Sequence, residues 1–206
     1  GVNDCSFHAH GNGTIGHMVS TYAIRLYAWS AYAFCDDSLQ STMNGYFDVD
    51  SRFEWLDKII RPKLLELKTL QEKISFTEQA LLKRLSDVRE NTVVNDTIQN
   101  ILINKGSLDI AKLAKKSFVS TRQLERLFHE YVGITPKKLS NLIRYQFLWR
   151  DILCEPDFDV LSAVYKFGYT DQSHLLREFK RYHSMDIHNA RIMAFKDVGN
   201  IQDVFV

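Results

Sequence analysis

A repeated motif carries two arginines whose side chains could bind phosphates or the edges of nucleic-acid bases. The motif Leu-x-Arg-x-Phe-x-x-Tyr begins at Leu124 and recurs 51 residues later at Leu175. Its leucine and phenylalanine fall at helical spacing and predict a buried stripe, so Arg126 and Arg177 lie off that stripe. Solvated surface arginines are the simpler alternative, but the duplicated context favours a contact with DNA.

The residues before each motif also repeat, and they predict the elements that position the arginines. Apolar residues at 110, 113 and 114 recur 50 positions later. Each copy therefore predicts a short helix, a tight turn and a second helix. Ser120 is a good N-cap for the second helix of the first copy. In the second copy, which has one extra residue at this place, the capping candidates are Thr170 and Asp171.

A longer helix is predicted between the two copies. Thr135-Pro136 combines a cap with proline at the first helical position, and Pro156 ends the helix. A connector of about 18 residues is about 27 Å long. Two second helices joined in this way could enter major grooves one DNA turn apart, about 34 Å. Basic residues near the helix ends would meet phosphates there: Lys137, Lys138, Lys180 and Arg181. For Lys137 and Lys138, a solvated helix start is nearly as good an explanation.

The net charge of +1 hides an asymmetry along the chain. Residues 1–106 hold 11 basic and 13 acidic residues, whereas residues 107–196 hold 15 and 10, a net charge of +5. A basic block beside an acidic one suggests that one half of the chain meets a polyanion.

The first half of the chain has a different composition. Residues 1–50 are rich in aromatic residues, threonine and glycine, and apolar runs at 14–19 and 22–29 predict two or three strands. Helical periodicity starts at Phe53 and continues past Pro62, which should restart the helix, to Ile74. Further helices are expected at 76–85 and 93–104, with a polar linker at 86–92 between them and a glycine stop at Gly106.

These patterns predict a predominantly α chain in which two helix-turn-helix subdomains are joined by a long linker helix. A small partial β region and a helical pair precede them. The expected organisation is a sensor or dimerisation region at 1–90, a double helix-turn-helix domain at 91–196 and a tail at 197–206. The chain begins with Gly1 rather than methionine, so we expect a processed chain or a fragment.

Two stretches of this region carry a family resemblance. GYTDQSHLLREFKRY at 168–182 and STRQLERLFHEYVGITP at 120–136 resemble the two helix-turn-helix signatures of the AraC/XylS family of bacterial transcription regulators. The resemblance covers about residues 93–191. Two departures are Phe118, at a turn position usually held by glycine, and Ser184-Met185-Asp186-Ile187, in place of a second Gly-x-Thr-Pro. The last helix is therefore expected to start differently.

The resemblance implies which side chains would meet DNA. The expected base contacts of the first copy are Thr121, Arg122, Glu125 and Arg126, and those of the second copy are Gln172, Ser173, His174 and Arg177. Solvent exposure alone would also explain His174. The expected phosphate contacts are Ser120, Lys137, Lys138, Thr170, Lys180 and Arg181. Arginine can bond guanine, glutamine adenine and glutamate cytosine, so the set could read sequence.

The resemblance also implies a role for the whole protein. It favours a transcription activator that contacts RNA polymerase and acts in the bacterial cytoplasm at the nucleoid. Residues 14–90 resemble the end of a family effector or dimerisation domain, most of whose barrel would precede Gly1. A small-molecule effector or a homodimer partner of this region is thus expected, with no cofactor and no membrane.

Other interpretations of the sequence are weaker. Cys5, His8, His10 and His17 have a spacing that could hold a metal, but a loose glycine-rich N-terminus explains them better, and no metal is expected. The three cysteines are far apart and predict free thiols. No nucleophile or phosphate-loop motif is present, so no enzyme is predicted. The alternative function is a helical protein–protein adaptor whose repeat serves packing only.

Overall fold

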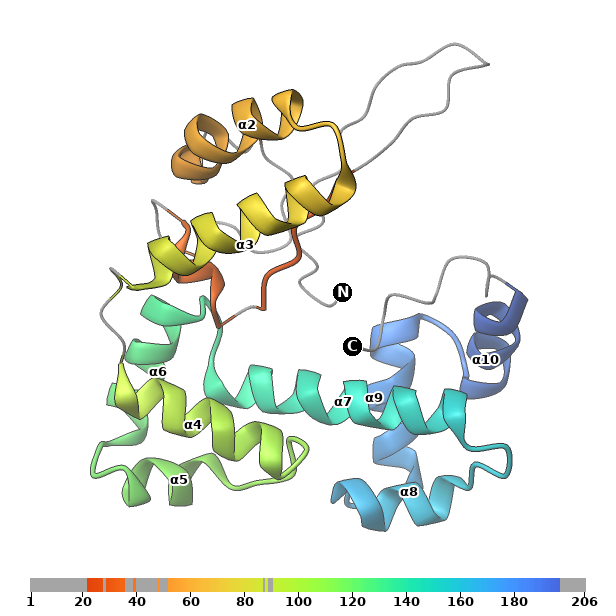
Figure 1. The fold of residues 1–206 in the computed structure, drawn as a ribbon. Helices are drawn as coiled ribbons and strands as arrows, with labels where there is room; N and C mark the ends of the chain where they lie inside the picture. Colours follow the sequence, from red (N-terminus) through yellow and green to blue (C-terminus); the bar gives the residue numbers. More distant parts are fainter. Residues whose placement is uncertain are drawn as a thin grey trace. The chain divides into compact units, whose positions relative to one another are not determined.

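The computed structural model describes residues 22–27, 29–35, 39, 48, 52–86, 88 and 91–196. The fold is predominantly α, as predicted, and no described residue lies in a strand (Figure 1). The chain packs into two compact units. The first unit contains residues 1–95 and 119–135, and the second contains residues 96–118 and 136–206. The predicted division at residue 91 concerns independent folding and stays a prediction.

The N-terminal part of the first unit is built around a small apolar core. It contains a 3-10 turn η1 (Ala31–Ala33), a π-helical segment η3 (Leu56–Ile60), α2 (Arg61–Glu66) and α3 (Leu70–Ser86). Phe34 and Phe53 are almost fully buried in this core, and Phe76 of α3 packs against it. The second helix of the first repeat, α6 (Thr121–Tyr131), also belongs to this unit.

The segment from Tyr22 to Tyr27 is not a strand, so that prediction is wrong for these residues. Half-buried and exposed side chains nevertheless alternate along 22–27. Ile24 and Leu26 pack on the small core. Among the described residues no second strand pairs with the segment, and a strand needs such a partner for its backbone groups. The apolar run at 14–19 lies outside the described residues.

The helices that follow begin and end at other residues than predicted. The predicted break between Ile74 and Phe76 does not occur, because α3 runs unbroken from Leu70 to Ser86. The break lies instead at 67–69, where the Thr69 hydroxyl caps α3 by accepting the backbone N–H of Glu72, and the Glu72 carboxylate accepts the backbone N–H of Thr69 in return. Ile59, which the helical periodicity from Phe53 places on the same apolar face, is 49% exposed. It lies in the π-helical segment, where side chains are spaced differently from those of an α-helix.

The second unit contains both short helices of the repeat and the connector. Its elements are α4 (Thr92–Ile103), which starts in the first unit, α5 (Ile110–Lys116), α7 (Pro136–Cys154), α8 (Val160–Phe167), α9 (Gln172–His183) and α10 (Ile187–Lys196). The helices α8 and α10 pack on α7 and on α9 (Figure 1). The predicted connector is confirmed within one residue at its C-terminal end. Leu148, Ile152, Leu175 and Phe179 are buried in the core that these helices share.

Equivalent positions of the two repeats have equivalent burial. Leu113 and Ala114 of α5 are buried, as are their counterparts Ala163 and Val164 of α8. The apolar stripes of α6 and α9 are likewise buried at their leucine and phenylalanine positions. The repeat predicted from the sequence is therefore a structural repeat. The helix α9 starts 51 residues after α6, whereas α8 starts 50 after α5, as the predicted extra residue requires.

The turns of the two repeats also share an unusual backbone conformation. Phe118 and Gly168 occupy the same place in their turns, and both have a left-handed backbone, with φ of 55° and 65°. Gly133 and Ser184, which follow the second helix of each copy, are left-handed as well. Two of these four positions therefore hold side chains that this conformation disfavours.

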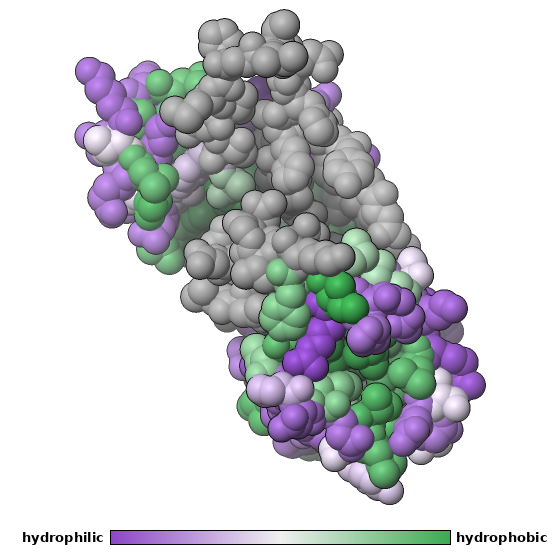
Figure 2. Space-filling model, turned by 90° about the vertical axis from the view of Figure 1, so that its right-hand side faces the viewer, coloured by the Kyte–Doolittle hydropathy of each residue, from purple (hydrophilic) through white to green (hydrophobic). Residues whose placement is uncertain are grey.

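The exposed surface of the second unit includes scattered apolar side chains. In the lower half of Figure 2, hydrophobic and hydrophilic side chains are mixed rather than separated into large patches. Exposed apolar residues of α8, α9 and α10 are Leu161, Tyr165, Leu176, Ile192, Met193 and Phe195. No helix within the described part of the chain has the length and apolar character needed to span a bilayer.

Candidate nucleic-acid interface

The N-terminus of α6 is fixed by a capping box. The Ser120 hydroxyl accepts a hydrogen bond from the backbone N–H of Gln123 at 3.1 Å, and the Gln123 side chain accepts one from the backbone N–H of Ser120 at 2.8 Å. The sequence predicted Ser120 as the cap but not the reciprocal bond from Gln123. Such a cap holds the first turn of α6 in a single geometry, which a sequence-reading helix needs.

The structure brings three of the four predicted base contacts of α6 to one face. Arg122, Glu125 and Arg126 are all exposed and line a surface hollow of about 630 Å³. His129, one turn further along, completes the lining. Thr121 is exposed at the first helical position but does not line the hollow. Leu124 and Phe128 are fully buried on the other side of the helix, so this polar face is turned to solvent.

The exposed polar face of α9 is built in the same way. Asp171 is its N-cap and accepts a hydrogen bond from the backbone N–H of His174 at 2.7 Å. Of the two predicted candidates, Asp171 is therefore the cap and Thr170 is not. Gln172, Ser173 and Arg177 are exposed. Within the described chain, the Arg177 guanidinium makes no ion pair.

His174 and Thr170 are tied to the protein more closely than expected. The His174 ring is half-buried and packs edge-on against the Tyr169 ring, with centroids 5.3 Å apart. Its Nδ1 accepts a weak hydrogen bond from the backbone N–H of Thr170 at 3.4 Å, and its Nε2 lies 3.7 Å from a carboxylate oxygen of Glu178. The ring therefore has a fixed orientation, and a base contact from it would use only the exposed edge.

The predicted phosphate contacts lie at exposed helix ends. Lys137 and Lys138 are exposed in the first turn of α7, and Lys180 and Arg181 are exposed in the last turn of α9. The Arg181 guanidinium stacks on the Tyr182 ring at 5.2 Å, which keeps it at the helix surface. The helices α6 and α9 belong to different units, so the spacing of the two faces stays a prediction.

The comparisons with known proteins agree with this geometry. A family model described as a helix-turn-helix domain matches residues 113–191. Residues 113–191 are an AraC-type helix-turn-helix domain. The chain is also 26% identical over 111 residues to an uncharacterized HTH-type transcriptional regulator of Haemophilus influenzae, which covers 54% of this chain and 36% of that protein. The match thus spans about a third of the relative's length. No solved structure matches the chain.

The AraC-type domain contains a buried ion pair that the sequence did not reveal. Arg144 of α7 donates to both carboxylate oxygens of Glu178 of α9, at 2.8 and 3.1 Å. Their side chains are only 8% and 9% exposed. The Tyr169 hydroxyl donates to the same carboxylate at 3.2 Å, and the Arg144 guanidinium lies 4.3 Å from the Tyr169 ring centre. Burial, followed by the Glu178 charge, raises the Tyr169 pKa well above its usual range.

This network connects the connector helix to the recognition helix. Glu178 is next to Arg177 in sequence and one turn after His174, so it holds α9 just behind its exposed face. A second set of charges joins α7 to α8, where Lys166 lies 2.6 Å from Asp151 and 3.0 Å from Glu155. The hydrogen bonds from Lys166 to Asp151 and then Glu155 raise the Lys166 pKa and keep it charged. The pairs were not predictable, because no periodicity relates their positions.

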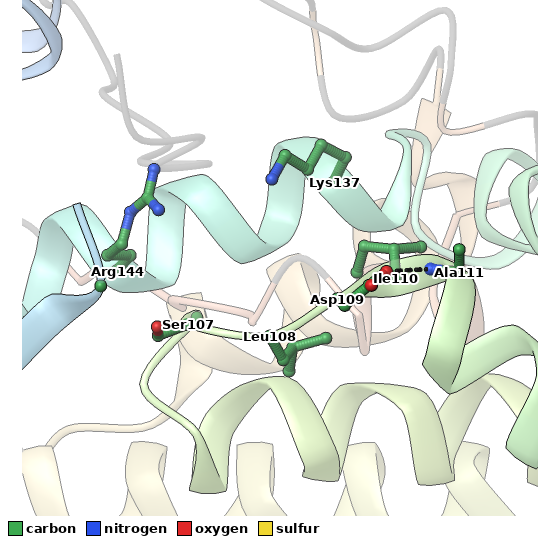
Figure 3. Close-up of a pocket in the computed structure, with 9 residues that line it drawn as sticks. Ser107, Leu108, Asp109, Ile110, Ala111, Lys137 and Arg144 are labelled. Carbon is green, nitrogen blue, oxygen red and sulfur yellow. Dashed lines mark hydrogen bonds between the residues drawn. The ribbon is translucent and has the colours of Figure 1, made fainter. Parts of the chain in front are cut away.

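A second hollow lies between α7 and the segment that leads into α5. Figure 3 shows Lys137 and Arg144 on α7 across from the extended segment that carries Ser107 and Leu108. The hollow has a volume of about 510 Å³. Asp109 lies at its edge but is occupied as the N-cap of α5, where it accepts the backbone N–H of Ala111 at 2.9 Å. The Arg144 guanidinium is occupied by Glu178, so Lys137 is the remaining cationic side chain among the described residues that line the hollow.

The N-terminal candidates for a metal site cannot be placed. Cys5, His8, His10 and His17 lie outside the described residues. Among the residues that the structure does describe, no three histidine, cysteine or acidic side chains gather as metal ligands would. Cys154 is an exposed free thiol, as predicted.

Proposed function

We propose that this chain is a sequence-specific DNA-binding transcription regulator that acts by binding rather than by catalysis. One observation carries the proposal. Both copies of a structural repeat hold a buried stripe on one side of their second helix and an exposed, capped, polar first turn on the other. The match to the helix-turn-helix family and the similarity to a bacterial HTH-type transcriptional regulator support the same function.

The proposed base contacts have side chains suited to base edges. Arg122, Arg126 and Arg177 can each donate two hydrogen bonds to guanine, and Gln172 can pair with adenine. Glu125 can accept from cytosine, while the hydroxyls of Thr121 and Ser173 can bond several bases. His174 is part of this set through its exposed edge. The capped first turns hold these side chains at the helix N-termini, where helix-turn-helix proteins contact bases.

The proposed phosphate contacts flank these two faces. Lysine and arginine near the helix ends would release counterions from the DNA, which makes affinity fall with salt concentration. The Ser120 and Thr170 regions would add contacts from the start of each second helix. The complete set is Ser120, Lys137, Lys138, Thr170, Lys180 and Arg181.

The finer parts of the proposal concern the whole protein. We infer that the two second helices enter successive major grooves, and that the regulator is an activator that contacts RNA polymerase at the bacterial nucleoid in the cytoplasm. A small-molecule effector or a second copy would act through the N-terminal region. These inferences rest on the family resemblance.

A selection of binding sites from random duplex DNA tests the function. A regulator should enrich one motif with two conserved segments about one helical turn apart. Its affinity for that motif should fall steeply between about 50 and 200 mM salt. A protein–protein adaptor would enrich no motif and would show no salt-sensitive binding to lose. Enrichment of one short segment alone would support DNA binding but contradict the use of two grooves.

A further inference from the structure

The helix α5 has an exposed face of three lysines that none of the proposed contacts uses. Lys112, Lys115 and Lys116 are all exposed and fall at positions i, i+3 and i+4, so they share one side of the helix. Leu113 and Ala114, on the other side, are buried in the second unit. Within the described chain, no acidic side chain lies within ion-pair distance of the three lysines. Their charges are therefore available to an external anion.

The second repeat lacks this face, although its first helix has the same burial pattern. The positions that match the three lysines hold Ser162, Tyr165 and Lys166 of α8. Lys166 is the single cation among them, and it is engaged by Asp151 and Glu155. Since the two helices occupy the same place in their repeats, the difference in charge is not required by packing.

An exposed aromatic residue adjoins the lysine face. Phe118 lies two residues after Lys116 and is 97% exposed. Its backbone is left-handed, with φ of 55°, which costs a phenylalanine more than the glycine found at the matching position, Gly168. Because the Phe118 ring is almost fully exposed, packing within the described part of the chain does not compensate the backbone strain. Strained exposed residues of this kind are expected where a partner contacts them.

We propose that Lys112, Lys115, Lys116 and Phe118 form a DNA-backbone anchor that only the first repeat possesses. The three lysines would neutralise phosphates, and the Phe118 ring would lie on the sugars of the same strand segment. Charge complementarity selects a polyanion as the occupant, and the first helix of a helix-turn-helix unit is the element that crosses the DNA backbone. The second repeat would then bind through its recognition helix with little help from α8. This proposal rests on the proposed function.

Binding of the full chain to random-sequence duplex DNA tests the anchor, because phosphate contacts do not depend on base sequence. The triple variant K112Q/K115Q/K116Q should lower the slope of log affinity against log salt by about one unit for each phosphate that is no longer neutralised. The double variant K68Q/K83Q is a control, since it removes two exposed lysines of the N-terminal region, and it should leave the slope unchanged. Circular dichroism checks that each variant is folded.

Two substitutions of Phe118 separate the ring from the backbone strain. Phe118→Gly should raise the melting temperature, because the strain is relieved, and yet lower DNA affinity several-fold with an unchanged salt slope. Phe118→Tyr keeps the ring and should keep the affinity. A structural role alone would change stability without changing affinity.

The outcomes distinguish the anchor from the function. If the unaltered chain fails to bind duplex DNA even at low salt, the proposed function is wrong. If it binds, but the triple lysine variant keeps the full salt slope, the lysine face is not an anchor. If Phe118→Gly binds as tightly as the unaltered chain, Phe118 is not a contact.

Discussion

Residues of different type take the same left-handed backbone conformation at matching positions of the two repeats. In the first copy, Gly133 is left-handed and Thr135-Pro136 starts α7. In the second copy, Ser184 takes the left-handed position with φ of 59°, and Asp186 caps α10 through the backbone N–H of Asn189 at 2.9 Å. The sequence predicted a different start for the last helix. The residues differ, but the left-handed turn before the next helix is retained.

Ser184 should therefore be a site of stored strain. Ser184→Gly should raise the free energy of unfolding by about 1 kcal/mol, because glycine adopts a positive φ without the clash of a Cβ atom. Gly133→Ala is the reciprocal variant and should lower stability, since its φ is +80° and an added Cβ would lie 3.0 Å from Leu39. Urea unfolding of both variants measures the two changes. Equal stability of Ser184→Gly and the unaltered chain would contradict the strain.

Two exposed cations of α9 should differ in what they recognise. Arg177→Ala should cost about 1–3 kcal/mol on the selected DNA site and relax the preference at one base pair, as removal of a bidentate hydrogen-bonding partner does. Lys180→Ala should weaken binding to all sequences alike and lower the salt slope by about one unit. Titrations on the selected site and on random duplex at several salt concentrations measure both. Identical behaviour of the two variants would contradict the assignment of one to bases and the other to phosphates.

His183 should make stability depend on pH. Its ring stacks on Phe179 with centroids 4.5 Å apart, and burial lowers its pKa below the ordinary value of 6.5. The unfolded chain then binds a proton at a higher pH than the folded chain, so the free energy of unfolding falls as pH drops below about 6.5. Thermal melts of the unaltered chain and of His183→Gln between about pH 5 and 7 test this. The variant should lose less stability on acidification, because the other histidines are present in both proteins.

At the scale of the elements, the connector and the recognition helix are held together by a buried charge pair. Arg144 and Glu178 come from α7 and α9, 34 residues apart, and each is more than nine-tenths buried. Removal of one partner leaves the other charge without compensation in an apolar core. Replacement of both by apolar side chains removes the two desolvation costs together. Loss of one partner should therefore lower the free energy of unfolding strongly, whereas replacement of both should lower it little.

A double-mutant cycle measures this difference. Arg144→Met alone should lower the free energy of unfolding by about 3 kcal/mol or more, whereas Arg144→Met with Glu178→Leu should recover most of the loss. The same variants test how α9 is positioned. Glu178 also accepts a hydrogen bond from the Tyr169 hydroxyl and lies close to the His174 ring. A stable double variant with weakened discrimination on α9's half of the DNA site would show that the pair orients the recognition helix. Simple additivity of the two single changes would contradict a direct coupling.

The elements that the sequence could predict are those fixed by nearby residues. Caps, proline at the first helical position and apolar spacing act within one or two turns, and they placed the starts of α6, α7 and α9 almost to the residue. The π turn at Leu56–Ile60 was not predictable, because it depends on how Phe53 and Ile60 fit the same small core. The Arg144–Glu178 pair was not predictable either, because no local sequence pattern relates residues 34 positions apart. Its partners meet only when α7 and α9 pack.

At the scale of the whole molecule, the recognition helix α6 is in contact with the N-terminal region. The Tyr32 ring lies edge-on to the Tyr131 ring, with centroids 5.1 Å apart. Leu39 lies against Gly133, two residues after the end of α6. A change in the N-terminal region would therefore reach the C-terminal end of α6 directly. The sequence predicted a boundary at residue 91 that would leave both contacts outside the DNA-binding domain.

A fragment of residues 91–196 tests how much α6 depends on those contacts. Both repeats and the connector lie inside it, so we expect it to be helical by circular dichroism and to bind duplex DNA. Amide hydrogen exchange should nevertheless be faster in the last turn of α6 than in the full chain, because Tyr131 loses its aromatic neighbour. Tyr32→Ala in the full chain is the matched control and should reproduce part of that increase, while exchange in α9 stays unchanged. An unfolded fragment would contradict the boundary at residue 91, and a folded fragment with full protection of α6 would show that the N-terminal contacts do not stabilise the recognition helix.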